Sequence, residues 1–303
     1  MKNFIRKNKG LFSLSIVLIL LFIGLIFLGL NYQRKHALNS NKENLQILAN
    51  EKAAQVNTFL ESQKEKLLIL NSMDVFKEVA LYPNDSSKVE AAKNMINNLK
   101  GTTPGITVST TEEIVIVGDI DVPGTDYSGQ PYSLLKEKRI VFERYYCPQR
   151  KKDYYAVVGP IYDGLETNKI IGTIAFDIKL DKISVLMEET LDSKTKEVYL
   201  IDETGLLLSG SKYISDGNKD GVLIQEVKSD GAKACLEDLK KYQKDGAVKE
   251  HEEKITEYLN YMGDKVFGMH VYVSTIMGCV IAEESTDEVA GFSLINNIKN
   301  LIY

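Results

Sequence analysis

Tryptophan is absent from this 303-residue chain, and cysteine and histidine are scarce. The three cysteines, Cys147, Cys235 and Cys279, are too few and too widely spaced for a disulfide framework, so we expect free and mostly buried thiols in preference to a Cys235–Cys279 bridge. The three histidines are isolated, and no His or Cys spacing typical of zinc ligands occurs. The composition therefore predicts neither a metal site nor a cofactor.

A large excess of charge of one sign is also lacking, since 37 Lys and Arg nearly balance 42 Asp and Glu. The net charge of −5 provides no basic surface that would gather nucleic acid, so nucleic acid is excluded as an expected partner. The sequence has no G-x-S-x-G elbow and no phosphate-binding loop of the G-x-x-x-x-G-K-[ST] type. The usual sequence frames for acyl and phosphoryl transfer are thus missing, and an enzyme is not expected.

One acidic segment resembles the start of a calcium-binding loop. DGNKDG runs from Asp216 to Gly221, but the twelfth position of the loop is Val227, and Glu226 comes one residue too early to close it. A plain Asp/Gly turn is the favoured interpretation. Whether Asp216–Gly221 binds calcium stays open at this point.

A long apolar run is present near the amino end. Residues 11–30 read LFSLSIVLILLFIGLIFLGL without a charged side chain. Such a run is long enough, as a helix, to cross the roughly 30 Å hydrocarbon core of a bilayer. Four basic side chains in the preceding tail favour a cytoplasmic amino end. We predict a cytoplasmic tail at 1–10 and an uncleaved transmembrane anchor at 11–31, which makes this a single-pass protein of the cell membrane with the bulk of the chain extracytoplasmic.

Helical periodicity follows the apolar run. Between Leu38 and Val79, apolar residues recur at three- and four-residue steps, which predicts one long helix. Its stripe either covers a core or forms a homodimer seam along Leu45 to Leu70. Ser87 begins a capping box for a second helix that ends near residue 100. Residues 32–100 are assigned to these two helices.

From residue 105 onward the pattern is mostly that of strands, rich in Ile, Val and Tyr. A first antiparallel sheet is expected within 101–190 and a second within 191–285, followed by a C-terminal helix over 286–303. The fold class is α+β. The expected strands of the first sheet are 105–110, 113–120, 139–146, 153–163 and 169–178; a helix at 180–191 leads to two short strands within 197–210, a helix at 231–244, a hairpin at 254–273 about residues 262–264, and a strand at 278–285.

Five stretches carry a resemblance to a known family. They are the anchor with its long helix, the loop DYSGQPYSLL, the pair VVGPIYD and IIGTIAFDIKLDKI, the turn YLIDETGLLLSG, and NYMGDKVFG leading to VIAEES. In this order they resemble the double Cache, or tandem PAS-like, extracellular sensor domains of bacterial and archaeal chemoreceptors, histidine kinases and cyclic-dinucleotide enzymes. The resemblance implies signal transduction or chemotaxis, with a small ligand bound in the membrane-distal module.

The resemblance also places the ligand site. Amino-acid-binding members share an Arg-x-Trp-Tyr cluster, which falls on residues 130–133, where Gln130 stands at the Arg position and Tyr132 at the Trp position. The family's later Tyr falls on Tyr145 or Tyr146. A neutral amide grips a carboxylate less well than a guanidinium does. The expected ligand is therefore either an amine or an amino acid.

The family's Asp falls on Asp177, which suits an ammonium group, whereas Arg139 or Arg144 is available for the carboxylate of an amino acid. A purely structural role is the alternative, with Asp177 capping the next helix and the tyrosines serving as ordinary sheet residues. The candidate ligand-binding residues are Tyr127, Gln130, Tyr132, Arg144, Tyr146 and Asp177.

The predicted function is an extracytoplasmic ligand-sensing region of a membrane receptor that binds an amine or amino acid. Two alternatives are a membrane-anchored surface interaction module with a vestigial pocket and, behind it, an exported hydrolase. The chain ends at Tyr303 without the second span and cytoplasmic signalling domain of family receptors. At this level we interpret it as either a truncated receptor or a binding protein that signals through a partner.

Overall fold

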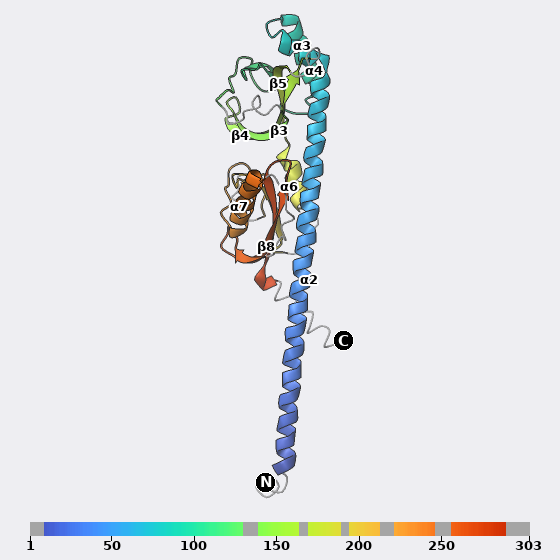
Figure 1. Cartoon of the computed structure of the whole chain (residues 1–303), viewed down its shortest axis with the longest axis vertical. Coiled ribbons are helices and arrows are strands. Elements are labelled where there is room, and N and C mark those ends of the chain that lie inside the picture. The colour runs from blue at the N-terminus through green and yellow to red at the C-terminus, as the bar shows by residue number, and fades with distance from the viewer. Residues whose placement is uncertain are drawn as a thin grey trace.

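The computed structural model describes residues 9–129, 139–163, 169–188, 194–212, 221–245 and 256–288. A 64-residue helix, α2 (Lys9–Ser72), runs the length of the molecule, and two β-sheet modules lie on one side of it (Figure 1). We call the module nearer the N-terminal end of α2 the proximal module and the other the distal module. Within the described part of the chain, no helix meets the length and hydropathy expected of a membrane span.

The distal module is a five-stranded antiparallel sheet in the order β2-β1-β5-β4-β3. The predicted first hairpin and the three longer strands are confirmed. The bounds are β1 Thr107–Ser109, β2 Val115–Gly118, β3 Val141–Cys147, β4 Lys152–Tyr162 and β5 Ile170–Asp177.

The two faces of the distal sheet differ because side chains alternate along each strand. One face presents large apolar residues, among them Val108, Val157, Ile174 and Phe176, which are buried in the same core as α2 and the two helices beyond it. Those helices are α3 (Asp74–Leu81) and α4 (Ser86–Leu99), and they cover the distal end of the molecule (Figure 1). The other face carries small and polar side chains and borders the cavity described below.

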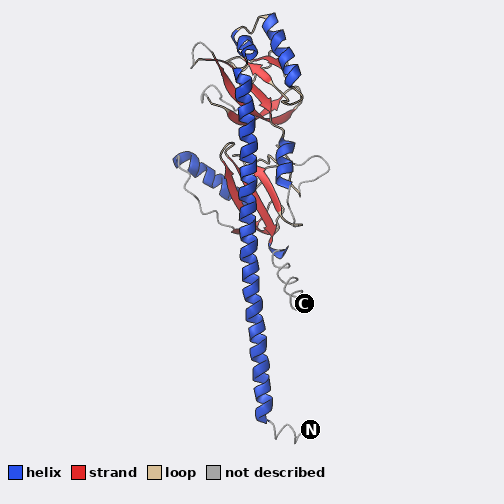
Figure 2. Ribbon diagram, turned by 90° about the vertical axis from the view of Figure 1, so that its right-hand side faces the viewer, coloured by secondary structure: helices blue, strands red, loops and turns tan. Residues whose placement is uncertain are grey.

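The proximal module is a four-stranded antiparallel sheet in the order β6-β9-β8-β7. Helix α6 (Leu180–Glu188) connects the two modules, and α7 (Asp230–Asp245) packs on the proximal sheet (Figure 2). The second of the two short strands expected within 197–210 does not form. Leu206 and Leu207 make only isolated bridges there. The bounds are β6 Glu197–Ile201, β7 Thr256–Leu259, β8 Lys265–Val273 and β9 Gly278–Ser285.

The apolar stripe of α2 faces both sheets. Leu45, Val56, Leu60 and Leu67 are each at most 1 % exposed and belong to the chain's own core. Of the two interpretations of this stripe, the structure thus supports the scaffold helix. Apolar side chains that remain exposed, such as Leu68, lie elsewhere on the helix surface.

Two predicted helix ends differ in detail. The helix expected to continue to Val79 breaks at Met73, whose extended backbone separates α2 from α3. The second helix is capped by Asp85, whose carboxylate accepts from the amides of Ser87 and Lys88, and not by Ser87. Aspartate is as good an N-cap as serine and stands two residues earlier. The predicted C-terminal helix lies outside the described residues from 289 onward.

The expected free thiols are wrong for two of the three cysteines. Cys235 of α7 and Cys279 of β9 form a disulfide with a Cα–Cα distance of 6.4 Å, whereas Cys147 is free and buried. The spacing in the sequence did not predict the bridge because α7 packs directly across β9, which brings together residues 44 positions apart. The disulfide therefore joins α7 to its sheet.

A buried lysine joins α2 to the connecting helix. Lys52 is completely buried, and its ammonium donates to the carbonyl of Leu186 in the last turn of α6. Cations are favoured at the C-terminal end of a helix, where carbonyls lack helical partners. We expect Lys52→Met, which keeps the aliphatic stem, to lower the free energy of unfolding by about 1–3 kcal/mol, because the Leu186 carbonyl loses a charged donor. Chemical denaturation measures this loss, with the exposed Lys66→Met on the same helix as the control; equal stabilities would contradict the assigned role.

Candidate functional site

A small cavity lies on the polar face of the distal sheet. The strands present short side chains there, namely Ala156, Thr173 and Ala175 from the middle of the sheet and Thr107 and Ser109 from β1. Because these residues do not fill the space above the sheet, a cavity of about 30 Å³ remains. This volume has room for about two water molecules.

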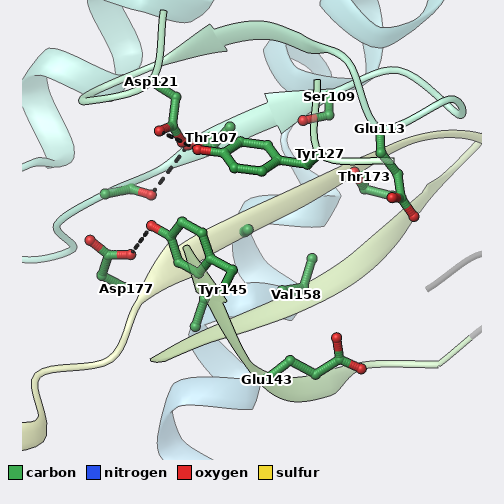
Figure 3. A pocket seen from close by; sticks show the side chains of 13 residues that line it. Thr107, Ser109, Glu113, Asp121, Tyr127, Glu143, Tyr145, Val158, Thr173 and Asp177 are labelled. Carbon is green, nitrogen blue, oxygen red and sulfur yellow. Dashed lines mark hydrogen bonds between the residues drawn. The ribbon is translucent and has the colours of Figure 1, made fainter. Parts of the chain in front are cut away.

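One wall of the cavity is a buried hydrogen-bond network on Asp121. The Asp121 carboxylate accepts from the hydroxyls of Tyr127 and Thr107, both at 2.7 Å (Figure 3). It also accepts from the Cys147 thiol at 3.6 Å. Asp121 is 5 % exposed and lies in the segment that follows the first hairpin. Both of its oxygens are thus satisfied, and the network holds the Tyr127 ring against the cavity.

The facing wall carries Asp177 at the end of β5. Its carboxylate accepts from the Tyr145 hydroxyl at 2.7 Å (Figure 3). The Arg150 guanidinium approaches its other oxygen at 3.8 Å. Burial raises the pKa of Asp177 to about 6, although Tyr145 and Arg150 both act to lower it. A further positively charged group near Asp177 would therefore stabilise its ionised form.

The aromatic rings of the site form a connected set. The Tyr127 and Tyr145 rings meet edge to face with centroids 5.7 Å apart, and Tyr145 lies against Tyr154 at 5.8 Å. The Arg150 guanidinium lies over the Tyr154 ring, 5.0 Å from its centroid. This stacking positions Arg150 beside the rim of the cavity, near Asp177.

The cavity is strongly acidic. Four carboxyl groups line it, those of Glu113, Asp121, Glu143 and Asp177, and no Lys or Arg is among its described lining residues. Burial, together with the charge of Asp126, raises the pKa of Glu113. Such a concentration of carboxyl groups favours a cation and disfavours an anion.

Backbone geometry at Gly105 brings the chain close to Asp177. Gly105 has φ +67°, a left-handed conformation that residues with a Cβ rarely adopt, and a Cβ there would overlap the Asp177 carboxylate. The amide of Gly105 donates to the Asp119 carboxylate at 3.3 Å, which holds the turn in place. Glycine is thus required where the loop before β1 borders the cavity.

No protein-family model and no curated protein sequence matches the chain, but solved structures do. The sensor domain of the V. cholerae histidine kinase DctB aligns with a TM-score of 0.59 over 84 % of this chain and 99 % of that domain, at 11 % identity. The ligand-binding domain of the Campylobacter jejuni chemoreceptor Tlp3 in complex with L-valine has a TM-score of 0.56, covering 85 % and 98 % at 15 % identity. That of the Pseudomonas aeruginosa PAO1 amino acid chemoreceptor PctB in complex with L-Arg has a TM-score of 0.55, covering 82 % and 97 % at 14 % identity.

The chain has the fold of these sensor domains. The similarity spans both sheet modules and nearly the whole of each matched domain, so the predicted double Cache resemblance is confirmed for the fold. Identities of 11–15 % establish the sensor-domain fold alone. The ligand of this chain has to be argued from its own site.

Within the sensor-domain fold, the predicted site residues fall into three groups. Tyr127 and Asp177 line the cavity, and the Asp177 side chain bonds Tyr145 at the position where a helix cap had been considered. Arg144 and Tyr146 are exposed on the opposite face of β3, and Tyr146 is 44 % exposed. The remaining two, Gln130 and Tyr132, lie outside the described residues.

The alternative arginine, Arg139, lies away from the cavity. It borders a separate groove of about 590 Å³ between α2, the distal sheet and the turn from β8 to β9. Asp216 and its neighbours up to residue 220 are outside the described residues, so calcium binding by this segment is not tested by the structure. In the described part of the chain, no group of three or more His, Cys, Asp or Glu side chains is arranged to hold a metal ion.

The residues selected from the sequence differ in part from those that border the cavity. Tyr145, and not its neighbour Tyr146, faces the cavity. Side chains alternate along β3, and Tyr145 lies on the same face as Glu143, which also lines the cavity. Both faces of β3 contain apolar residues, so its alternation alone did not choose between them. Asp121 and Arg150 lie in turns where the sequence carries no periodic signal.

Proposed function

We propose that the chain is the sensing region of a membrane receptor and that its distal cavity binds a small organic amine. The observation that carries this proposal is the pairing of four carboxyl groups with two tyrosine rings in one buried site. Carboxylates and aromatic faces are the groups that recognise alkylammonium ions. The sensor-domain fold, and the complexes of chemoreceptor domains such as PctB with L-Arg, support a small metabolite as the ligand.

Asp177 is the expected anchor for the ammonium group. It is 7 % exposed, and its pKa is raised to about 6 because its burial is only partly offset by a hydroxyl and a distant guanidinium. An ammonium ion placed against it would supply the missing positive charge at short range. The present cavity is smaller than such a ligand, so binding requires the lining side chains to separate, and this change is the event that the receptor transmits.

An amino acid is the second candidate ligand, and Arg150 is the observation that favours it. The Arg150 guanidinium approaches Asp177 at 3.8 Å from the rim of the cavity and is 40 % exposed, so it is accessible to a carboxylate. A zwitterion would then bind Asp177 through its ammonium group and Arg150 through its carboxylate. This arrangement replaces Arg139 and Arg144, which lie away from the cavity.

The membrane anchor and the homodimer belong to the same proposal. The uncharged run of residues 11–30 lies in α2 and exposes large apolar side chains, including Leu20, Phe22, Leu25 and Phe27, which supports a span from 11 to 31. The Cys235–Cys279 disulfide supports an extracytoplasmic location of the modules, where disulfides persist.

A homodimer through α2 is supported by exposed Ile47, Leu68 and Ile69. We further propose that this region binds ligands without catalysing a reaction.

The test is a thermal unfolding screen of the full chain against amines, diamines, amino acids and dicarboxylates. A saturating shift with simple amines supports the favoured ligand class, and a shift that requires both an ammonium and a carboxylate supports the amino acid. Dicarboxylates serve as the matched control, since the acidic cavity should reject them. No shift with any compound, in a protein that unfolds cooperatively, would favour the surface interaction module.

Binding of the amine should depend on pH with a midpoint set by Asp177. Because the pKa of this carboxyl is about 6, the ligand competes with a proton below that value. The apparent dissociation constant should rise about tenfold between pH 7 and pH 5, as calorimetric titration would measure. The ligand-free protein has the opposite trend, because a raised carboxyl pKa stabilises the fold below pH 4 and that stabilisation is lost as the pH rises through 6. A pH-independent affinity between pH 5 and pH 7 would contradict the role of Asp177.

A further inference from the structure

The proximal module repeats the tyrosine–carboxylate pair that borders the distal cavity. In the strand orders of the two sheets, β9 and β7 hold the places that β5 and β3 hold in the distal sheet. Tyr258 of β7 donates to Glu283 of β9 at 2.8 Å, just as Tyr145 of β3 donates to Asp177 of β5 at 2.7 Å. The proximal sheet therefore presents a second buried carboxyl group at the equivalent position.

The Glu283 carboxyl group is buried and only half satisfied. It is 1 % exposed, and its Oε1 accepts from the hydroxyls of Tyr199 and Tyr258, each at 2.8 Å. Its Oε2 is buried and has no hydrogen-bond partner among the described residues. An ionised carboxylate with an unsatisfied buried oxygen is more costly than a protonated one, because burying a charge costs more than burying a neutral polar group. Burial raises the pKa of Glu283 to about 7.

A second buried glutamate lies directly opposite Glu283 on the neighbouring strand. Glu197 of β6 is 2 % exposed and is the register partner of Glu283. Side chains directly opposite each other in an antiparallel pair lie close together, about 5 Å between Cβ atoms. Glu197 accepts from the hydroxyls of Ser211 and Tyr261 at 2.6 Å each. Burial raises its pKa, and its charge raises that of Glu283 further.

Among the other described charged groups around the pair, Lys212 partly offsets the charge of Glu197, and the acidic groups of α7 add negative charge. Lys212 attracts Glu197, but its ammonium donates to the backbone carbonyl of Lys194. On α7, Asp230 adds negative charge near Tyr258, and Asp238 contacts His270 of β8 at 3.3 Å. The described titratable and charged groups on this side of the sheet include Glu197, Tyr199, Lys212, Asp230, Asp238, Tyr258, Tyr261, His270, Tyr272 and Glu283.

Tight packing restricts what can reach Glu283. The Tyr258 hydroxyl lies against the Cα atoms of Gly231 in α7 and Gly268 in β8, where a Cβ on either glycine would overlap it. In the distal module the corresponding tyrosine, Tyr145, borders a cavity instead. The proximal site therefore suits the smallest possible ligand, a proton, whereas the distal site has room to develop around an organic molecule.

We propose that Glu197 and Glu283 form a proton-binding site that makes the proximal module respond to the pH of its surroundings, independently of the distal cavity. Below neutral pH a proton from solvent occupies one of the facing carboxyl oxygens, and the pair carries a single negative charge. Above neutral pH the proton leaves, and two buried negative charges face each other beneath α7. Their repulsion weakens the packing of α7 on the sheet, while the Cys235–Cys279 disulfide keeps the helix attached.

The experiment is thermal unfolding of the full chain between pH 5.5 and pH 8.5 in an Asp177→Asn background, which removes the distal carboxyl group that titrates in the same range. A carboxyl pKa raised by folding stabilises the protein at low pH, and the stabilisation is lost as the pH rises through the folded value. We expect the melting temperature to fall by roughly 5–10 °C across this range. Adding Glu283→Gln should remove most of the fall, whereas Glu257→Gln, an exposed carboxylate on β7, should leave it unchanged.

A spectroscopic titration tests the same site without relying on variant stability. The infrared band of neutral carboxylic acid should disappear with a midpoint near pH 7 in the Asp177→Asn protein. Adding Glu283→Gln should remove this band, whereas Glu197→Gln should keep it and move its midpoint to lower pH, because the facing negative charge is gone. A band that disappears below pH 5, or a Glu283→Gln protein that keeps the full fall in melting temperature, would overturn the proposal. Neither outcome depends on ligand binding at the distal cavity, so the two sites are tested separately.

Discussion

Asp177→Asn should abolish the stabilisation that an amine confers on the full chain. At a ligand concentration a hundred times the dissociation constant, the wild-type protein should gain about 2.7 kcal/mol of unfolding free energy. The variant should gain almost none, because the amide cannot supply the negative charge that faces the ammonium group. The comparison is made by thermal unfolding with and without the amine, at pH 7.5, where Asp177 is ionised.

The asparagine variant is well suited to this test because it preserves the local structure. Its amide oxygen can still accept from the Tyr145 hydroxyl, and removal of a buried charge does not itself destabilise the ligand-free fold. Asp264→Asn, in the exposed turn between β7 and β8, is the matched control and should retain the full shift. An equal increase in melting temperature for Asp177→Asn and wild-type protein would show that the ammonium group binds another carboxylate.

Loss of the Cys235–Cys279 disulfide should be the most destabilising single change in the proximal module. The bond closes a loop of 44 residues, and the chain-entropy relation gives about 4 kcal/mol of stabilisation for that length, as an upper value. Reduction should therefore lower the melting temperature by roughly 10 °C. Thermal unfolding with and without a reductant measures the change.

The same experiment on a Cys235→Ala, Cys279→Ala protein separates the disulfide from other effects of the reductant. This variant should unfold at the temperature of the reduced wild type and should not respond further, because the remaining Cys147 is a free thiol. A wild-type melting temperature that is insensitive to full reduction would show that α7 is held on β9 by packing alone. The bond lies on the same face of the proximal sheet as Glu283, so its loss should also steepen the pH dependence proposed there.

Local patterns were sufficient for most secondary structure. The strand GCVIAEES was predicted at residues 278–285 and is β9 with the same bounds, because a buried apolar run between a glycine and a polar segment has few alternatives. The α2 stripe from Leu45 to Leu70 was equally clear, but its partner was not, since an apolar stripe suits a core and a dimer seam alike. Packing on both sheets assigned the stripe to the core.

The candidate site was predictable only in part. Asp177 was identified through its resemblance to the position that ends a strand in the sensor family, and it lines the cavity. Tyr146 was chosen where Tyr145 faces the cavity, because a shift of one residue along a strand changes the face and nothing local fixed the register. Asp121 and Arg150 come from turns, and only the folded sheet brings Asp121 to the same cavity as Asp177 and places Arg150 beside Asp177.

The sequence by itself determined the α+β class, the long helix and most strand positions, because these depend on periodicity and on residue types close together in the chain. The tertiary structure decided which face of each strand is buried, which cysteines pair, and which carboxyl groups share an environment. Glu197 and Glu283 are 86 residues apart and become neighbours only because β6 pairs with β9. Contacts between distant segments depend on the packing of whole sheets and helices, and no short segment of the chain encodes them alone.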